Sequence, residues 1–345
     1  MQRVAKMLKR IAPELAQTVD LRYIILRNIY FNQPIGRRAL SSVLSKSERT
    51  LRAEVKRLEG QGLLEIDPRG MKVTNDGERI ITDLENFMFY LKGLNTISEE
   101  IKCKFGCKDV IIVSGNSDED KTIIKELGKE AADFLKSSLK DGDIIAVTGG
   151  TTIAQIPKFL NSTSHKNVVI VPGRGGLGEK VEIQPNTIAA ELAKKLGVEY
   201  ELLYVPDNLG SAAMDSVVNE PSVREVISVI NNATILLHGI GGAEEMASRR
   251  GMSREQVLDI INKGAVAEAF GFYFSKEGKI VHTTTSIGLS AKALGKIRTV
   301  IAVAGGANKA PAIQAFLRYH QPSVLITDEG AARRLLEIEG GDNHE

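Results

Sequence analysis

The pattern of apolar and polar positions divides the chain into a helical beginning and a longer part in which strands and helices alternate. Over residues 14–32 apolar side chains recur at helical spacing, and Pro34-Ile35-Gly36 ends that pattern. A short helix is predicted over residues 37–44, and a turn at Ser45-Lys46 separates it from the next helix. The two helices, joined by so tight a turn, predict a helix–turn–helix.

The residues that follow this turn extend the motif to a larger unit. Ser47 is a candidate N-cap for a helix that runs to about Gln61 and is ended by Gly62. Two short alternating strands then flank Asp67-Pro68-Arg69-Gly70, a sequence typical of turns. A helix, a helix–turn–helix and a β-hairpin in this order predict a winged-helix domain over residues 1–74.

A long apolar stripe follows this domain, within residues 75–106. The pattern predicts one helix from Asn75 to about Lys104, which at about 3.6 residues per turn exceeds seven turns. Such a helix could be a linker between two domains that also forms a dimer seam, or it could pack on its own domain. The sequence leaves both alternatives open.

From Asp109 onward short β-branched runs alternate with helical stretches. Strands are predicted at residues 110–115, 144–150, 167–173, 199–205, 233–241, 299–306 and 323–327. Helices are predicted between most of them, at residues 119–139, 151–160, 186–196, 222–231, 253–263, 308–319 and 328–337. This alternation predicts an α/β domain over residues 107–340, with a mostly parallel sheet covered by helices on both faces.

Charge is distributed unevenly along the chain, although the net charge is only +2. The first 74 residues hold 15 Lys+Arg against 7 Asp+Glu, and the other 271 hold 30 against 36. Such an asymmetry indicates a basic module that meets a polyanion, attached to a body that does not.

The second helix of the helix–turn–helix combines an apolar inner stripe, Leu51, Val55 and Leu58, with a basic outer side. Arginine can bind guanine through two hydrogen bonds, while lysine and hydroxyl groups suit phosphates or base edges. The predicted DNA contacts are Arg37, Arg38, Lys46, Ser47, Arg49, Thr50, Arg52 and Lys56, with Arg69 and Lys72 on the wing. Glu48 and Glu54 weigh against DNA binding, and we expect Glu54 to face away from the duplex. The alternative is a solvated charged helix in a protein-binding domain.

Three segments of the predicted α/β domain combine glycines with polar or basic side chains, where parallel sheets bind their ligands. Gly149-Gly150-Thr151-Thr152 lies between a strand and a helix, where free N–H groups and hydroxyls cradle oxyanions. Arg174-Gly175-Gly176 follows the next strand, and its arginine suits a phosphate. Lys309 follows Gly305-Gly306 near a helix start and suits a phosphate for the same reason.

A fourth segment, Gly264 to Glu268, places one carboxylate among small apolar residues. Glu268 could accept hydrogen bonds from sugar hydroxyls, or it could serve as a cap or an ion-pair partner. His238 ends a strand and is a weaker site candidate, because such histidines, like His282, more commonly belong to the core or the surface. Together the loops and the carboxylate predict a ligand with phosphate at one or both ends.

Several other kinds of site are not expected. The glycines of 172–178 match a dinucleotide fingerprint formally, but no helix opens there and no acidic strand end follows at the required distance. No Walker motif, nucleophile elbow or metal-ligand spacing occurs. Cys103 and Cys107 are too few for a disulfide framework or a zinc site and are expected to be reduced thiols of a cytoplasmic protein. No membrane span and no secretory signal are expected.

Several motifs taken together resemble the SorC-type sugar-binding regulators over nearly the whole chain. They are GGTTIAQIP, PGRGGLG, HGIGGAEEMASRR, GAVAEAFGFYF and AVAGGANKAPAIQAFL, in addition to the winged-helix pattern. The resemblance implies a Rossmann-like, sugar-isomerase-like body similar to glucosamine-6-phosphate deaminase and ribose-5-phosphate isomerase. It implies a repressor of genes for triose-phosphate interconversion that binds operator DNA, with no enzymatic activity and no cofactor. A tandem or palindromic operator would call for a dimer or tetramer.

The resemblance also implies an effector and the residues that hold it. The effector would be fructose 1,6-bisphosphate or a related sugar phosphate. Its ligands would be Thr151, Thr152, Arg174, Gln184, Glu268 and Lys309, with one arginine of the Arg249-Arg250 pair. An alternative is an active sugar-phosphate isomerase or deaminase with an accessory DNA-binding head, which would need Glu268 to act with His238 or Asp143. A constitutive DNA-binding protein with an inert body is a further alternative.

Overall fold

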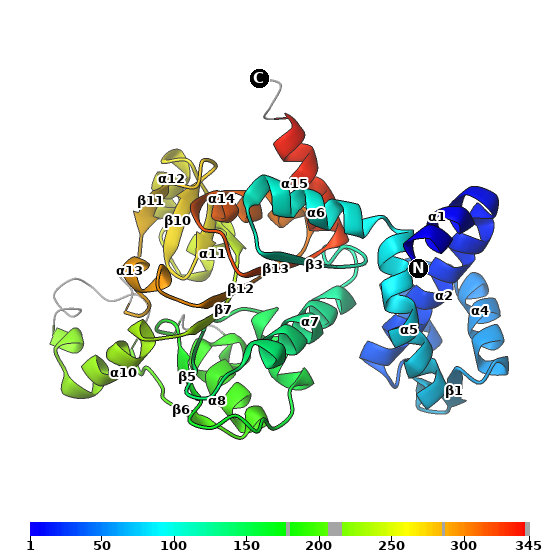
Figure 1. Cartoon of the computed structure of the whole chain (residues 1–345), viewed down its shortest axis with the longest axis horizontal. Helices are drawn as coiled ribbons and strands as arrows, with labels where there is room; N and C mark the ends of the chain where they lie inside the picture. The colour runs from blue at the N-terminus through cyan, green and yellow to red at the C-terminus, as the bar shows by residue number, and fades with distance from the viewer. Residues whose placement is uncertain (177–179, 206–215, 285–286, 342–345) are drawn as a thin grey trace. The chain divides into compact units, whose positions relative to one another are not determined.

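The structure is a computed structural model that describes residues 1–176, 180–205, 216–284 and 287–341 (Figure 1). The chain forms two compact units. Met1–Ile97 and Ser114–Ile123 make up the first, which we call the head unit. Ser98–Val113 and Ile124–Glu345 make up the second, the body unit. Each unit is described by itself.

The head unit is helical, with a single β-hairpin among its described elements. In chain order these are α1 (Gln2–Ile11), α2 (Pro13–Asn32), α3 (Arg37–Leu44), α4 (Glu48–Gly60), β1 (Leu64–Asp67), β2 (Gly70–Val73) and α5 (Asn75–Leu91). The predicted helix–turn–helix is α3 and α4, and the predicted wing is the antiparallel pair β1–β2. Helix α1, half of whose residues are apolar and half polar or basic, was not predicted.

Local signals account for the ends of these elements. The Ser47 side chain accepts a hydrogen bond from the backbone N–H of Thr50, so it caps α4 as predicted. Buried side chains of α2, α3, α4 and the hairpin share one core, which includes Ile25, Leu40, Leu51 and Met71. This core fixes α3 and α4 on α2.

The prediction of one continuous helix from Asn75 to Lys104 is wrong. The structure has two helices, α5 and α6 (Leu94–Phe105). Gly93 lies between them with a φ of 73°, a left-handed conformation that ends a helix and favours glycine. Helix α5 packs on α1 and α2 of its own unit, with Met88 and Leu91 buried against Ala5 and Ala16.

A parallel sheet of seven strands forms the centre of the body unit, as predicted. Its strands are β3 (Asp109–Val113), β4 (Ile144–Val147), β5 (Val169–Pro172), β6 (Glu199–Tyr200), β7 (Ile235–Gly239), β12 (Thr299–Val303) and β13 (Val324–Asp328). They lie in the order β3-β13-β12-β7-β4-β5-β6, and all neighbours are parallel. Without β3 this is the Rossmann strand order, in which the connections diverge from the two central strands, here β4 and β7.

Helices cover this sheet (Figure 1). Those of the body unit include α7 (Thr122–Ser138), α8 (Pro185–Leu196), α10 (Pro221–Asn231), α14 (Ala310–Tyr319) and α15 (Glu329–Gly341), α7 beginning in the head unit. Helices α8 and α10 pack on β4 and β5, and α15 packs on β3 and β13. The predicted helix over 151–160 is instead a 3-10 helix, η1 (Ile153–Phe159), which contains Pro157.

A second sheet was not predicted, because no strand was predicted over residues 264–283. It has four antiparallel strands in the order β11-β10-β9-β8. They are β8 (Gly241–Gly242), β9 (Ala265–Ala269), β10 (Phe272–Ser275) and β11 (Ile280–Thr283). Helices α11 (Ala243–Arg249) and α12 (Arg254–Asn262) pack on β9, as does α14. Alanine has low strand propensity, so β9 forms through this packing and not through a local signal.

Candidate effector pocket and DNA-binding face

A pocket opens in the body unit at the carboxyl ends of β4 and β7, where the connections diverge. It has a volume of about 780 Å³, counted out to its open mouth. Ten of the twelve residues predicted to bind an effector line it: Gly149, Gly150, Thr151, Thr152, Arg174, Gln184, Arg249, Arg250, Glu268 and Lys309. The topology therefore brings together segments that are up to 160 residues apart in the sequence.

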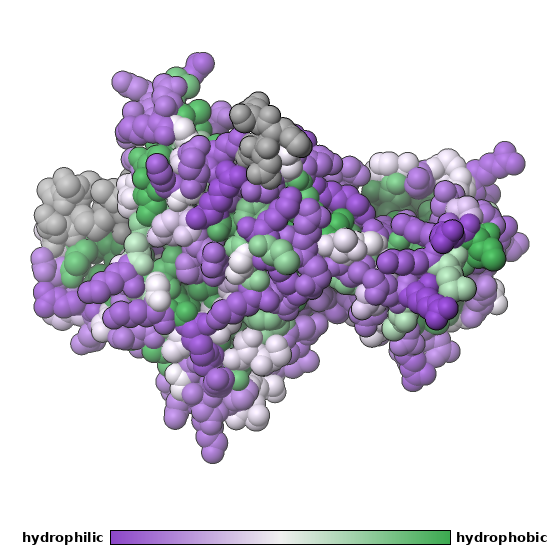
Figure 2. All heavy atoms as spheres, turned by 45° about the horizontal axis from the view of Figure 1, so that its top comes forward, coloured by the Kyte–Doolittle hydropathy of each residue, from purple (hydrophilic) through white to green (hydrophobic). Residues whose placement is uncertain are grey.

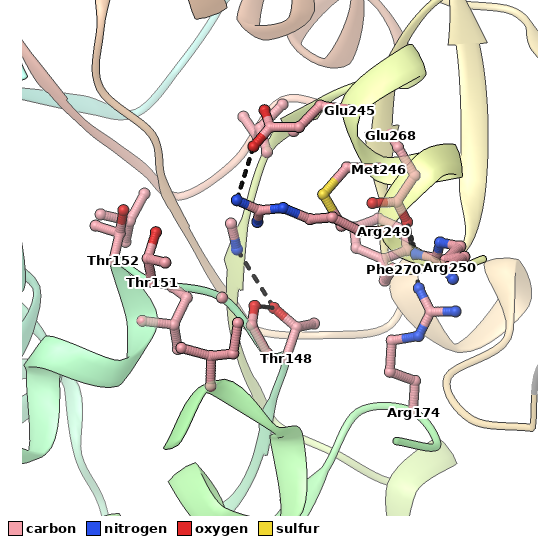
Figure 3. Close-up of a pocket in the computed structure, with 18 of the residues that line it drawn as sticks. Thr148, Thr151, Thr152, Arg174, Glu245, Met246, Arg249, Arg250, Glu268 and Phe270 are labelled. Carbon is pink, nitrogen blue, oxygen red and sulfur yellow. Dashed lines mark hydrogen bonds and ion pairs between the residues drawn. The ribbon is translucent and has the colours of Figure 1, made fainter. Parts of the chain in front are cut away.

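One wall of the pocket is the loop after β4 (Figure 3). A side chain at Gly149 would place its Cβ 2.6 Å from the carbonyl oxygen of Ile183, so only glycine fits there. Gly150 donates its N–H to the same oxygen and has a φ of 132°, which favours glycine. These contacts hold the loop so that Thr151 and Thr152 line the pocket.

The opposite wall holds a buried ionic cluster (Figure 3). Glu268 Oε1 accepts hydrogen bonds from Arg174 Nη1 at 3.2 Å, from Arg250 Nη2 at 2.6 Å and from the N–H of Gly271 at 2.6 Å. The three charged side chains are 3–4% exposed. Of the roles left open for Glu268, the structure shows the ion pair. Because Arg174 comes from the loop after β5, Glu268 from β9 and Arg250 from the end of α11, the cluster joins three segments.

Other charged residues of the pocket are closer to solvent. Arg249 Nη2 lies 2.8 Å from Glu245 Oε1, and both side chains are partly exposed. Lys309 ends η3 (Ala307–Lys309), just before α14, and also lines the pocket. In total the lining carries four basic side chains and two carboxylates. Such a balance suits an anionic ligand.

Two predicted residues lie outside the lining. Gly175 donates its N–H to the carbonyl of Ile287, and Gly176 donates to that of Val205. Their N–H groups therefore take part in backbone pairing and are not directed at a phosphate in this structure.

Two residues considered as partners of Glu268 in an enzyme also lie elsewhere. His238 is fully buried between Phe270 and Phe316, and burial lowers its pKa to about 4. Asp143 precedes β4, at the edge of the sheet opposite the pocket, where it pairs with Arg298 at 2.9 Å. Neither residue lines the pocket that Glu268 lines.

Several lining residues were not among the predicted effector ligands. They are Thr148, Ile153, Ile183, Glu245, Met246, Phe270 and Val303, with residues 239–241. Met246 and Phe270 supply apolar surface, and Thr148 Oγ1 accepts the N–H of Gly239 at 3.3 Å, which ties the ends of β4 and β7 together. The sequence signal that could have identified some of these residues is the glycine-containing end of the strand at 239–241, which we interpreted only as the end of a strand and not as part of a ligand site.

The outer side of α4 in the head unit carries the predicted base-reading residues. Arg49, Arg52 and Lys56 are exposed, while Leu51, Val55 and Leu58 are buried. The predicted contacts Arg37, Arg38, Lys46, Ser47 and Thr50 are exposed as well. The Ser47 and Thr50 hydroxyls lie 2.8 Å apart and share a hydrogen bond.

Glu48 and Glu59 of this helix are exposed, Glu48 lying 3.9 Å from Arg38, whereas Glu54 is held away from that side. Glu54 is 8% exposed and accepts a hydrogen bond from Arg22 Nε of α2 at 2.7 Å, so it faces the interior of the unit as expected. On the wing, Asp67 accepts a hydrogen bond from the backbone N–H of Arg69 and also pairs with the Arg69 side chain, and these contacts lower the pKa of the Asp67 carboxyl. The exposed side of α4 therefore keeps its basic character.

Features that would indicate other kinds of protein are not seen in the described part of the chain. No group of histidine, cysteine and carboxylate side chains there could hold a metal ion. Cys103 and Cys107 are free, and burial raises the pKa of the Cys107 thiol to about 11. No described helix is both long and apolar enough to cross a membrane, and the face drawn in Figure 2 is mainly hydrophilic.

Comparisons with known proteins agree with this division. Residues 18–88 match the family described as "CggR N-terminal DNA binding domain", and residues 90–337 match the family described as "Putative sugar-binding domain". The chain is 42% identical to the central glycolytic genes regulator of Bacillus subtilis, over 96% of this chain and 98% of that one. It is 40% identical to the protein of the same name from Priestia megaterium, over 97% and 99% of the two chains.

Solved structures give the same result. The crystal structure of a SorC family transcriptional regulator from Enterococcus faecalis is 40% identical, with a TM-score of 0.66 over 70% of this chain and 99% of that one. The full-length sorbitol operon regulator SorC from Klebsiella pneumoniae is 20% identical, with a TM-score of 0.65 over 92% and 99%, and so shares the fold.

The two matched domains define a transcriptional regulator with a DNA-binding head and a sugar-binding effector domain. The chain belongs to the SorC family of sugar-binding transcriptional regulators.

Proposed function

We propose that the protein represses genes of central glycolysis, those of triose-phosphate interconversion, and that fructose 1,6-bisphosphate or a related sugar phosphate relieves or modulates this repression from the body pocket. The observation that carries the proposal is the pocket itself, where threonines, arginines and Lys309 converge at the switch point of the sheet. The name of the relative that is 42% identical along nearly the whole chain supports the choice of genes.

The pocket chemistry supports an assignment of roles. Thr151, Thr152 and Lys309 present hydroxyls and a cation beside a loop held open by glycines, an arrangement that suits a phosphate. Arg174 and Arg249 or Arg250 lie toward the other wall and suit a second phosphate (Figure 3). Glu268 and Gln184 are then the groups that recognise sugar hydroxyls between the phosphates.

Operator DNA is the partner of the head, in the cytoplasm. The exposed basic side of α4 enters the major groove, where Arg49, Arg52 and Lys56 contact bases and phosphates, with Arg37, Arg38 and Lys46 on the backbone. The regulator binds as a dimer or tetramer, because an operator with repeated half-sites needs one head for each. Residues 1–74 bind DNA, residues 75–106 connect, and residues 107–340 sense the sugar.

The test is a titration of fluorescently labelled DNA from upstream of the chain's own operon. The anisotropy is followed as full-length protein is added, with and without fructose 1,6-bisphosphate. We expect tight binding whose affinity or stoichiometry changes with the sugar bisphosphate. DNA binding that is indifferent to every sugar phosphate tried would refute the proposed role of the body, and an absence of DNA binding would refute that of the head.

A further inference from the structure

Ten residues that follow β3 and include the first two of α7 belong to the head unit, although the chain on either side of them belongs to the body unit. Residues 114–123 pack with Met1–Ile97, while the body unit holds Ser98–Val113 and resumes at Ile124. We call residues 114–123 the clasp segment. Since Ser114 directly follows Val113, the last residue of β3, the clasp segment is joined directly to a strand of the body sheet.

The clasp segment is held to helix α2 by a buried polar network. Arg27 is 2% exposed and donates a hydrogen bond from Nη1 to the carbonyl oxygen of Ser114 at 2.8 Å. Asn28 is fully buried; it donates to Asp120 Oδ2 at 3.1 Å and accepts from Thr122 Oγ1 at 2.9 Å. Buried polar contacts of this kind hold only in one relative arrangement of their partners, because losing one leaves a desolvated group without a partner.

Thr122 is the centre of this network. Its hydroxyl donates to Asn28 Oδ1 and accepts from Asn32 Nδ2, both at 2.9 Å. Asn28 and Asn32 are one turn apart on α2, so a single hydroxyl binds two successive turns of the helix. Its backbone N–H is also bonded, at 2.8 Å, to Asp120 Oδ1. A movement of Thr122 therefore cannot leave α2 unaffected.

In the body unit, strand pairing and a buried hydrogen bond connect the end of β3 to the pocket. Val113 pairs in register with Asp328 of β13. Asp328 is fully buried, and its Oδ2 accepts the N–H of Gly306 at 2.7 Å. Gly306 begins the loop that carries Lys309 into the pocket lining. These contacts form a continuous path from Lys309 through Gly306 and Asp328 to Val113. Val113 is bonded directly to Ser114, the first residue of the clasp segment.

Helix α2 in turn supports the recognition helix. Arg22 of α2 donates a hydrogen bond from Nε to Glu54 of α4 at 2.7 Å, and Ile25 and Ile29 pack in the same core as Leu51 and Leu58. A change in α2 therefore acts directly on the helix that carries the predicted DNA contacts.

From these contacts we propose that the clasp segment transmits the state of the sugar-phosphate pocket to the DNA-binding helices. A ligand phosphate on Lys309 alters the 305–309 loop, Asp328 passes the change to β13 and β3, and Thr122 and Arg27 pass it to α2. The inference rests on the proposed function, because it assumes that an anion bound at Lys309 changes DNA affinity. Arg27, Asn28 and Thr122 are positioning residues that contact neither the pocket nor the exposed side of α4.

The test uses the full chain with Thr122→Val, which keeps the shape of the side chain and removes the hydroxyl, and Thr122→Ser as the matched control that keeps it. Anisotropy titrations of labelled operator DNA with and without fructose 1,6-bisphosphate give the factor by which the sugar changes DNA affinity. We expect Thr122→Val to reduce that factor to less than about a third of the wild-type value, since coupling between sites is typically 5–150-fold. Sugar affinity by calorimetry should stay within about twofold, and Thr122→Ser should respond as wild type.

A wild-type factor retained by Thr122→Val would overturn the inference. Arg27→Lys, which shortens the reach to the Ser114 carbonyl, serves as the second variant and should lower the factor too if Thr122→Val does not fold. Amide hydrogen exchange of the peptide that spans residues 114–123 gives a readout that needs no sugar. Operator DNA should slow the exchange of this peptide in the wild-type protein and not in Thr122→Val. If wild-type protein shows this protection but no sugar response, the proposed effector fails and the clasp segment stands. Exchange unaffected by operator DNA in wild type counts against the clasp segment itself.

Discussion

The two units use arginine in opposite ways. On α4 of the head unit, Arg49 and Arg52 are exposed, and the buried carboxylate of their helix, Glu54, faces inward toward Arg22. In the body unit, Arg174 and Arg250 are almost completely buried and share Glu268. The first arrangement presents charge to a large polyanion and depends on salt. The second fixes guanidinium groups in one geometry before a small ligand arrives.

The two kinds of arginine also differ in how much their substitution should change the stability of the fold. An exposed arginine contributes little to stability, so its substitution should change binding alone. A buried cluster has already lost its hydration, so removal of one partner leaves the others desolvated. Substitutions in the body pocket should therefore affect stability and ligand binding together, whereas those on α4 should separate the two.

The largest effect is expected for Glu268→Ala. The substitution leaves two guanidinium groups side by side in a buried site without their shared carboxylate. The free energy of unfolding should fall by about 3–5 kcal/mol, as measured by urea denaturation of the full chain. Glu245→Ala is the matched control, because it breaks the partly exposed pair with Arg249 and should cost less than about 1 kcal/mol. A similar loss of unfolding free energy in both variants would show that the buried ion pairs stabilise the fold no more than the exposed pair does.

A smaller effect is expected for Lys309→Ala, this time on the ligand. Loss of one charge-assisted hydrogen bond to a phosphate costs about 1.5–3 kcal/mol, so the fructose 1,6-bisphosphate concentration needed to change DNA binding should rise about tenfold to hundredfold. DNA affinity without sugar should be unchanged. Lys296→Ala removes an exposed lysine outside the pocket lining and should have no effect. An unaltered sugar response in Lys309→Ala would contradict our placement of the phosphate.

Arg52→Ala tests the exposed side of the comparison. Loss of a base or phosphate contact should weaken operator binding by about 1–3 kcal/mol, while sugar affinity and thermal stability stay the same. Arg334→Ala, at an exposed position on α15, is the control for loss of one positive charge and should bind DNA like wild type. If Arg52→Ala lowers stability and sugar affinity along with DNA affinity, the residue supports the fold instead of reading DNA.

The head could be predicted almost completely from the sequence because its signals are local. Ser47, the Asp67-Pro68-Arg69-Gly70 turn and the apolar spacing of α4 each act within a few residues. The exceptions have physical reasons as well. The apolar residues of α1 recur at helical spacing, but the segment is short and half basic or amide, and among its residues only Ala5 is buried, against α2 and α5. Gly93 interrupts an apolar stripe that continues on both sides of it.

The pocket could be predicted only in its local parts. Glycine loops at strand ends, such as Gly149-Gly150, are visible in the sequence because each precedes a helix or a basic residue. The pairing of Arg174 with Glu268 joins residues 94 positions apart across a sheet that was not predicted. Gln184 and the Arg249-Arg250 pair came from the family resemblance and not from their local context. Long-range ion pairs of this kind carry no signal in one sequence.

The smallest expected effect is a difference between the two units in how their stability depends on pH. None of the residues of the head unit is a histidine, whereas burial holds the pKa of His238 in the body unit at about 4, below its ordinary value of 6.5. The unfolded chain therefore binds more protons than the folded chain between these two values, so stability is lost as pH falls below 6.5. Between pH 7.5 and 5.5 this one group should cost the body unit about 1 kcal/mol.

Calorimetric unfolding of the full chain at these two pH values tests this expectation, with His238→Asn as the comparison. His282 and His320, whose pKa values are also lowered by burial, add to the loss in the same direction. The pH dependence should therefore become weaker in His238→Asn without vanishing, because the two partly buried histidines remain. A variant with the wild-type pH dependence would show that His238 takes up its proton in the folded state at an ordinary pKa. A loss of stability confined to the unfolding transition of the head unit would contradict this contrast between the units. The head unit has carboxylates but no histidine, and carboxylates such as Asp67, whose pKa is lowered, titrate below this pH range.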